Sequence, residues 1–284
     1  MLTLAIQKKG RLSSKSIELL EKCGIHLKGS GQDKLKTSSY NFPLDVLFLR
    51  DDDIPSCVED GIADIGIVGD NVVYETDVQL EKVMPLGYGK CRLSIAVPKS
   101  SDYTDLSSLE NKRIATSFGV ILQKYLDEKG VKADIHTISG SVEIAPGIGM
   151  ADAIFDIVST GSTLISNGLK EVDTLLYSEA SLYCNKNISD EKRALLDKIC
   201  FRISSVKTAK DYKYILLNVP NDKLDIICEI LPGMKSPTIM PLGEKDWSSV
   251  HSVIKGNKFW DIIEQLKKAG AESLLVTDIE QMIL

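Results

Sequence analysis

The sequence is poor in the residues that mark metal sites, disulfide frameworks and membrane spans. It has three histidines and six scattered cysteines, with no Cys-x-x-Cys pair and no ligand spacing between the two residue types. No run reaches the roughly 18 apolar residues that a membrane-spanning helix needs, and the first ten residues carry charge instead of a signal-peptide core. We therefore expect a cytoplasmic protein with free thiols, no structural zinc and no membrane partner.

The sequence also lacks an excess of positive charge. Lysine and arginine total 34 against 40 aspartates and glutamates, which gives a net charge of −6, and the acidic residues are spread along the chain. Such a balance argues against a nucleic-acid partner. The 284 residues, of which 43% are hydrophobic, suffice for two or three compact units.

The N-terminal part alternates strands with helices. A strand over 2–7 is followed by a polar turn at 8–11 and a helix, which Ser13 or Ser14 can cap and which Gly24 ends. The next round has a strand over 44–49, an acidic turn at 51–53 expected to cap a helix at Pro55, and a strand over 62–68. This alternation predicts a largely parallel sheet covered by helices.

A second α/β set begins near Arg92 and runs to a strand over 151–158. Two similar units that join near residues 90 and 180 predict a bilobed molecule, in which ligands bind in the cleft between lobes. We expect lobe I to comprise residues 1–90 and about 180–205, and lobe II residues 91–179.

The last 75 or so residues change pattern. Apolar periodicity predicts strand, helix, strand, strand, helix and strand at 212–219, 222–231, 236–242, 247–254, 259–266 and 273–277, with Pro232-Gly233 ending the first helix. The order βαββαβ is the ferredoxin-like arrangement. We expect this domain to span 209–284, after a polar linker at 205–211.

The most informative stretch is EIAPGIGMADAIFDIVSTGSTL, residues 143–164. An apolar strand leads into a loop of small hydroxyl residues and glycine before a helix, which offers several donors to one point and suits a phosphate. The plainer alternative is that Ser162 or Thr163 only caps the helix. The loop residues are Ser159, Thr160, Gly161, Ser162 and Thr163.

This stretch resembles the signature of the ATP phosphoribosyltransferases, in which a glutamate, a glycine turn, an Asp-hydrophobic pair and a Ser/Thr-Gly-x-Thr-Leu loop follow in order. Further similar segments are AIQKKGRL, LRDDDIP, DIGIVGDNV, CRLSIAVP, KRIATS, LPGMKSPTIMPL and KKAGAESLLV. The resemblance covers residue 2 to about 280. The last two segments look like the regulatory domain of the family's long form.

The resemblance implies two α/β lobes like periplasmic-binding-protein type II domains, with the active site in the cleft and a ferredoxin-like domain at the C-terminus. It implies a Mg²⁺-dependent reaction in which N1 of ATP displaces pyrophosphate from phosphoribosyl pyrophosphate (PRPP). Charge stabilisation should dominate, because the leaving group gathers negative charge. Mg²⁺ leans on substrate phosphates, so no dedicated protein cage is expected.

On this interpretation the loop 159–163 holds the 5-phosphate of PRPP, and Glu143 and Asp156 bond the ribose hydroxyls. Glu143 has an alternative interpretation as a first-turn residue that favours a helix dipole. The candidate ATP-binding residues are Lys8, Lys9, Arg11, Asp70, Asn71, Cys91 and Arg92. The three basic residues of the turn at 8–11 can instead be a solvated surface, and Cys91 can simply pack.

The family's C-terminal domain implies feedback inhibition by histidine and a homo-oligomer, a hexamer built from dimers. We expect hydroxyls from Ser236 and Thr238 to bind the amino-acid head, with Gly270 and Ala271 leaving room for backbone contacts. The rival interpretation is a bilobed binding or regulatory protein without catalysis. A catalytically inactive regulatory subunit is a third, which the intact loop 159–163 disfavours.

Overall fold

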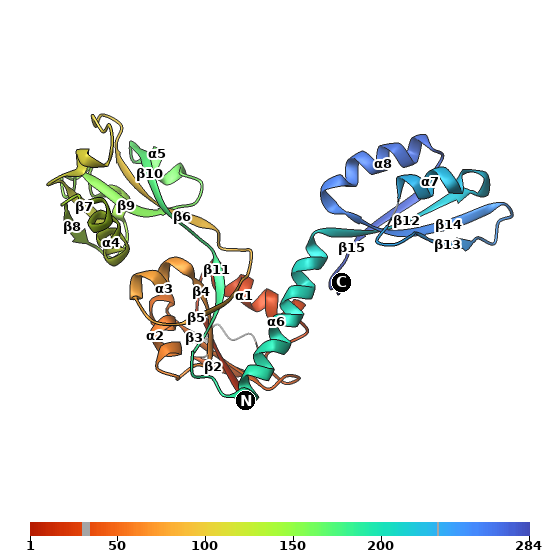
Figure 1. Ribbon diagram of the computed structural model, residues 1–284, viewed down its shortest axis with the longest axis horizontal. Coiled ribbons are helices and arrows are strands. Elements are labelled where there is room, and N and C mark those ends of the chain that lie inside the picture. Colours follow the sequence, from red (N-terminus) through yellow and green to blue (C-terminus); the bar gives the residue numbers. More distant parts are fainter. Residues whose placement is uncertain (30–34, 232) are drawn as a thin grey trace. The chain divides into compact units, whose positions relative to one another are not determined.

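The computed structural model describes residues 1–29, 35–231 and 233–284 (Figure 1). Pro232, expected to end a helix, lies outside them. The chain separates into two compact units, described here one at a time. The first comprises Met1–Glu21 and Ile25–Leu196, and the second comprises Lys22–Gly24 and Asp197–Leu284.

The first unit contains two sheets, and lobe I is built on the six-stranded one. Its strand order is β2-β3-β1-β4-β11-β5; β1 pairs in parallel with β3 and β4, whereas β11 is antiparallel to β4. The strands are β1 (Leu2–Gln7), β2 (Lys36–Ser38), β3 (Leu44–Leu49), β4 (Ile65–Gly69), β5 (Glu81–Pro85) and β11 (Ala180–Cys184). The helices are α1 (Arg11–Lys22), α2 (Ile54–Glu59) and α3 (Asp70–Thr76), with a 3₁₀ turn η2 (Asp51–Asp53) before α2.

Helix α2 packs very closely on β4, and one glycine makes this possible. A Cβ atom at Gly66 would lie 2.8 Å from Cγ2 of Ile54 and 2.9 Å from Cγ2 of Val58, closer than real Cβ contacts allow. Both aliphatic side chains are fully buried. The GIVG sequence of β4 therefore brings its carboxyl end, and the start of α3, into a fixed position.

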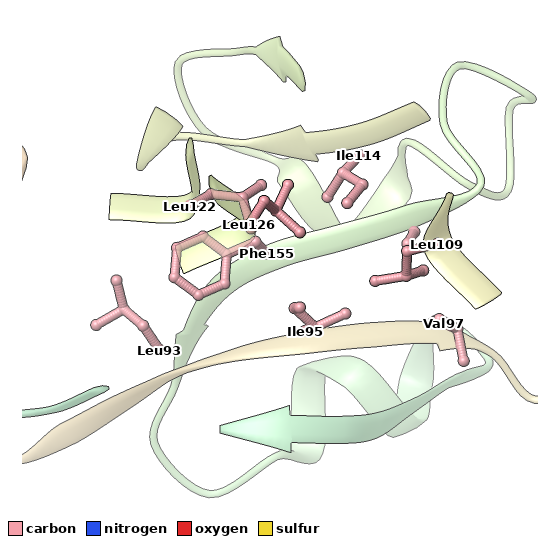
Figure 2. Close-up of a cluster of buried hydrophobic side chains, with 9 residues drawn as sticks. Leu93, Ile95, Val97, Leu109, Ile114, Leu122, Leu126 and Phe155 are labelled. Carbon is pink, nitrogen blue, oxygen red and sulfur yellow. The ribbon is translucent and has the colours of Figure 1, made fainter. Parts of the chain in front are cut away.

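Lobe II is the five-stranded sheet with order β10-β6-β9-β7-β8. Figure 2 shows its core, in which Phe155 of β9 faces Leu122 and Leu126 of α4. Burying each such side chain contributes about 1.5–3 kcal/mol. The elements are β6 (Cys91–Pro98), η3 (Leu106–Leu109), β7 (Arg113–Thr116), α4 (Gly119–Lys129), β8 (Asp134–Thr137), η4 (Val142–Ile144), β9 (Ala153–Val158), α5 (Ser162–Ser166) and β10 (Leu169–Ser178).

Two neighbouring strand ends connect the lobes. The chain leaves lobe I after β5 and enters β6 at Cys91, and it returns from the end of β10 at Ser178 into β11. Cys91 and Ser178 are direct partners in the β6–β10 ladder. Helices of the two lobes also touch, because the Glu75 carboxylate accepts the backbone N–H groups of Val120 (2.9 Å) and Ile121 (3.1 Å).

The second unit holds the expected ferredoxin-like domain. Its sheet order β13-β14-β12-β15 is that of a βαββαβ fold, and Figure 1 shows α7 and α8 on the same face of the sheet. These helices bury Ile227 and Leu266 against the strands. Helix α6 (Asp190–Lys210) begins in the first unit and continues into the second. The other elements of the second unit are β12 (Tyr212–Pro220), η5 (Asn221–Lys223), α7 (Leu224–Ile230), β13 (Thr238–Pro241), β14 (Trp247–Lys255), η6 (Gly256–Lys258), α8 (Phe259–Lys268) and β15 (Glu272–Asp278).

Three local expectations are wrong. Helix α1 starts at Arg11, so Ser13 and Ser14 lie inside it, and their hydroxyls donate back to carbonyls of the preceding turn. The three aspartates of η2 give α2 no side-chain cap. The stretch 205–211 is not a linker, because α6 continues to Lys210. None of the helices in the described parts of the chain is long and apolar enough to span a bilayer.

Candidate active site

The hydroxyl loop follows β9 directly. Gly161 has φ +80°, a left-handed backbone that glycine adopts without strain, and it turns the chain into α5. No side chain caps α5; instead the hydroxyls of Thr160 and Ser162 lie 3.0 Å apart, and both residues are exposed. The cap-only alternative therefore does not describe this loop, and its hydroxyls are accessible to an anion.

Asp156 lies three residues before the loop and is half-buried. Its Oδ1 accepts the backbone N–H of Ile157 at 2.8 Å. Burial raises the pKa of Asp156, and the nearby Glu143 carboxylate on η4 raises it further. The structure thus places the two predicted acids close enough to repel each other, an arrangement that a hydrogen-bonding sugar or a cation would relieve.

Arg92, at the start of β6, is bound to a residue that the sequence analysis missed. Its Nε and Nη2 each donate to one carboxylate oxygen of Glu171 on β10, both at 2.6 Å, while Nη1 donates to the Ser159 carbonyl at 3.2 Å. The Arg92 guanidinium lowers the pKa of Glu171 to about 2, and hydroxyl donors from Ser94 and Thr174 lower it as well. Arg92 therefore connects Glu171 on β10 with the backbone at the start of the hydroxyl loop.

Asp70 and Asn71 open α3, and their side chains point inward. Asp70 is 4% exposed and Asn71 is 5% exposed. The Asp70 carboxylate accepts the Tyr183 hydroxyl at 2.7 Å and pairs with Lys82 at 2.9 Å. Burial alone would raise the pKa of Asp70, but hydrogen bonds from Tyr183, Lys82 and Ser181 outweigh it and the pKa is lowered.

The Asn71 side chain holds the junction between the lobes. Its Oδ1 accepts the Ser178 hydroxyl at 2.8 Å, and the Ser178 Oγ in turn accepts the Asn71 backbone N–H at 3.0 Å. Cys91 lies opposite Ser178, and burial raises the pKa of its thiol, so the thiol is poorly suited to act as a nucleophile. Asn71, Ser178 and Cys91 therefore fix the paired ends of β6 and β10, next to Arg92.

The basic turn lies at the carboxyl end of β1. The backbone N–H of Lys8 donates to the Leu49 carbonyl at 2.7 Å, which anchors the turn to β3. Lys9 and Arg11 are exposed. Parallel β1, β3 and β4 all end at this edge of the sheet, so the turn lies on the same edge as Asp70.

The four candidate histidine contacts do not converge within one chain. Ser236 and Thr238 lie before and on β13, whereas Gly270 and Ala271 immediately precede β15. These are opposite edge strands, separated by β14 and β12. At about 4.8 Å per strand they lie roughly 14 Å apart across the sheet, too far for one amino acid to bridge.

A cavity of about 470 Å³ lies between α3 and α4, away from the hydroxyl loop. Several of its polar wall groups are already bonded: Lys124 pairs with Asp77 at 2.6 Å, and the Tyr125 hydroxyl donates to Asp173 at 2.7 Å. We do not place substrate there. In the described ranges, no group of three or more histidine, cysteine or acidic residues is arranged to hold a metal ion.

A two-lobed α/β unit with an accessible hydroxyl loop beside a pair of carboxylates is the arrangement expected of a phosphoribosyltransferase. The sequence profile described as ATP phosphoribosyltransferase matches residues 50–205, and that described as HisG, C-terminal domain, matches residues 209–281. The chain belongs to the ATP phosphoribosyltransferase family, the enzymes of the first step of histidine biosynthesis.

Individual relatives support this membership. An ATP phosphoribosyltransferase of Cytophaga hutchinsonii is 58% identical, with 100% of this chain and 99% of the relative covered. A solved structure described as the ATP phosphoribosyl transferase (HisG:HisZ) complex from Thermotoga maritima is 30% identical with a TM-score of 0.64, over 72% of this chain and 96% of that one.

More distant similarity concerns the fold alone. The L-arginine-bound protein Tv2483 has a TM-score of 0.50 at 15% identity, over 72% of this chain and 83% of its own. The two lobes are of the periplasmic-binding-protein kind, as expected from the sequence.

Proposed function

We propose that the loop Ser159, Thr160, Gly161, Ser162 and Thr163 binds the 5-phosphate of PRPP, while Asp156 and Glu143 bind its ribose hydroxyls. The exposed hydroxyls of Thr160 and Ser162, which cap no helix, carry this assignment. Asp156 is well placed because the same strand delivers it and the loop. A carboxylate accepts hydrogen bonds from two vicinal hydroxyls with charge assistance, which orients the anomeric carbon.

Mg²⁺ is the cofactor in this proposal. The paired carboxylates of Asp156 and Glu143 fit a cation held mainly by substrate, since Mg²⁺ usually keeps waters and uses one or two carboxylates plus phosphates. When bound, it neutralises charge on the departing pyrophosphate. The residues of the chain position the sugar and exclude water, and N1 of adenine needs no general base because it already carries a lone pair.

ATP is assigned to lobe I. Lys8, Lys9 and Arg11 supply positive charge for its triphosphate at the edge where β1 and β4 end. The other candidate residues on this side position the site without pointing into it: the Asp70 carboxylate bonds to Tyr183 and Lys82, and Asn71 bonds to Ser178, which lies opposite Cys91. The substrates meet between lobe I, residues 1–90 plus about 180–205, and lobe II, residues 91–179.

We also propose that the domain 209–284 binds histidine and that bound histidine inhibits the reaction. Because Ser236 and Thr238 lie at one sheet edge and Gly270 and Ala271 at the other, a single histidine reaches both pairs only where edges of two copies meet. This supports a homo-oligomer, for which we propose a cytoplasmic hexamer built from dimers. Solution mass with and without histidine tests the assembly; a monomer under both conditions contradicts it.

The reaction itself is tested with the purified full chain, ATP, PRPP and Mg²⁺. We expect pyrophosphate and phosphoribosyl-ATP only when all three are present. Pyrophosphate release without ATP would show that the assigned reaction is wrong, and binding of PRPP without any turnover would favour the non-catalytic alternative. Replacing Mg²⁺ by excess chelator should abolish turnover, and turnover that persists contradicts the cofactor assignment.

A further inference from the structure

Glu171 lies on β10, seven residues beyond the signature stretch 143–164, and its carboxylate accepts four hydrogen bonds. It accepts both prongs of Arg92 at 2.6 Å, the Ser94 hydroxyl at 2.7 Å and the Thr174 hydroxyl at 3.1 Å. Glu171 is 25% exposed and Arg92 is 29% exposed. A carboxylate with four donors in a partly buried wall has little freedom to change rotamer.

The register places this cluster beside the proposed PRPP site. Ser94 of β6 is the ladder partner of Thr174 on one side and of Asp156 on the other. Ladder partners carry their side chains on the same sheet face, as do residues two apart along a strand. One face of the sheet therefore carries the side chains of Arg92, Ser94, Thr174 and Asp156. The hydroxyl loop begins at Ser159, directly after β9, the strand that carries Asp156.

Arg92 connects the cluster to the loop. Its Nη1 donates to the carbonyl of Ser159, the first loop residue, at 3.2 Å. A guanidinium is planar, so two bonds to one carboxylate fix the plane in which the third donor points. If Glu171 loses one oxygen acceptor, the plane is free to rotate and the Ser159 carbonyl loses its fixed partner.

We propose that Glu171 is a positioning residue for the PRPP loop, and that it acts through Arg92 to hold the entry of the loop at Ser159. The inference rests on the proposed function of residues 159–163. It also moves Arg92 from the ATP side, where the sequence analysis placed it, to the PRPP side. On this proposal Glu171 does not contact substrate, and its four donors serve to fix its own rotamer and the Arg92 guanidinium.

Glu171→Gln in the full chain provides the main test. The dissociation constants of PRPP and ATP are measured separately by calorimetry in the presence of Mg²⁺. We expect about a tenfold weaker PRPP affinity, as for a lost hydrogen bond to a charged group, and ATP affinity within twofold of the parent. An unchanged PRPP affinity, or equal losses for both ligands, overturns the proposal.

Asp152→Asn is the matched control. Asp152 accepts the same pair of hydrogen bonds from Arg113, but it lies immediately before β9, about 20 Å along the chain from Ser159. It should leave both affinities unchanged, and a PRPP-specific loss there would show that any broken ion pair in lobe II suffices. If Glu171→Gln does not fold, Ser94→Ala removes one donor to Glu171 and should weaken PRPP about threefold; no change contradicts the proposal.

A double variant separates positioning from a direct role. If Glu171 acts only through Arg92, Arg92→Met with Glu171→Gln should bind PRPP no more weakly than Arg92→Met alone. If the two substitutions instead weaken PRPP binding additively, Glu171 does not act through Arg92 and the proposal is wrong. Thr163→Val is measured in parallel: if it weakens PRPP binding and Glu171→Gln does not, the loop assignment stands and the positioning role fails. If neither variant changes PRPP binding, the loop assignment itself fails.

Discussion

The Glu171→Gln variant should also lower the free energy of unfolding of lobe II at neutral pH, and this loss should shrink as the pH falls. The pKa of Glu171 is about 2, against an ordinary value of 4.5, because the Arg92 guanidinium binds its carboxylate. A depressed pKa contributes stability that is present above about pH 4.5 and is lost as the pH falls through about 2. A shift of about 2.5 units at 1.36 kcal/mol each sets a ceiling near 3 kcal/mol, and partial exposure reduces it to about 1–3 kcal/mol.

The assay follows urea unfolding from pH 7 down to pH 3 for parent and variant, without ligand. Far-UV circular dichroism reports both units, whereas fluorescence reports only the second, because both tryptophans, Trp247 and Trp260, lie there. The difference in free energy of unfolding should be largest at pH 7, and roughly half or less should remain at pH 3. The fluorescence transition should not shift.

Asp152→Asn again serves as the control. Arg113 and Asp152 have the same forked geometry, but their side chains are 42% and 40% exposed, so the pair should contribute less than about 1 kcal/mol. A Glu171→Gln loss that stays constant from pH 7 to pH 3 would refute the linkage argument. So would a loss no larger than that of Asp152→Asn, since burial of the Glu171 cluster would then have no energetic effect.

Three further predictions concern the two ligand sites. Thr163→Val should weaken PRPP binding by about 1.5–3 kcal/mol and leave ATP binding unchanged in calorimetric titrations; equal losses for both ligands would contradict the loop assignment. Asp156→Asn should raise the thermal midpoint of the first unit at pH 7. Burial raises the pKa of Asp156, so the stability that its protonated carboxyl contributes is lost as the pH rises through the raised pKa. The affinity for PRPP should fall at least tenfold, and a variant that melts at a lower temperature while binding PRPP normally would be evidence against both statements. Thr238→Val should weaken histidine inhibition without changing the uninhibited rate, and full inhibition would place the effector elsewhere.

Local signals in the sequence were sufficient for most of the strands and helices and for the strand, glycine turn and short helix around the loop 159–163. The C-terminal strands and helices follow from apolar periodicity, and their βαββαβ order determines the ferredoxin-like topology. The segment from Asp156 to Thr163 is contiguous, so its strand, glycine turn and hydroxyls can be interpreted together. Helix α6 was harder to predict, because its apolar residues follow no clear stripe and its last turn carries lysines that resemble a linker.

Contacts between distant segments were decided only by the tertiary structure. Arg92 and Glu171 are 79 residues apart in sequence, and Asp70 and Tyr183 are 113 apart, so no local pattern connects either pair. The sequence suggested Asp70 for ATP because it follows the end of an apolar strand, and Arg92 because it lies at the expected junction of the lobes, both positions typical of ligand contacts. Strand register instead turned Asp70 into the lobe and directed Arg92 to the loop.

The separation of the proposed histidine contacts has the same origin. Residue types and local turns are properties of short segments, and they select Thr238 and Gly270 as suitable for binding an amino acid. Which edge of a sheet each segment occupies depends on strand order, and strand order is set by burial of the whole hydrophobic face. The sequence alone therefore determined the types of element and the chemistry of the loop, while the packed sheets decided which side chains meet.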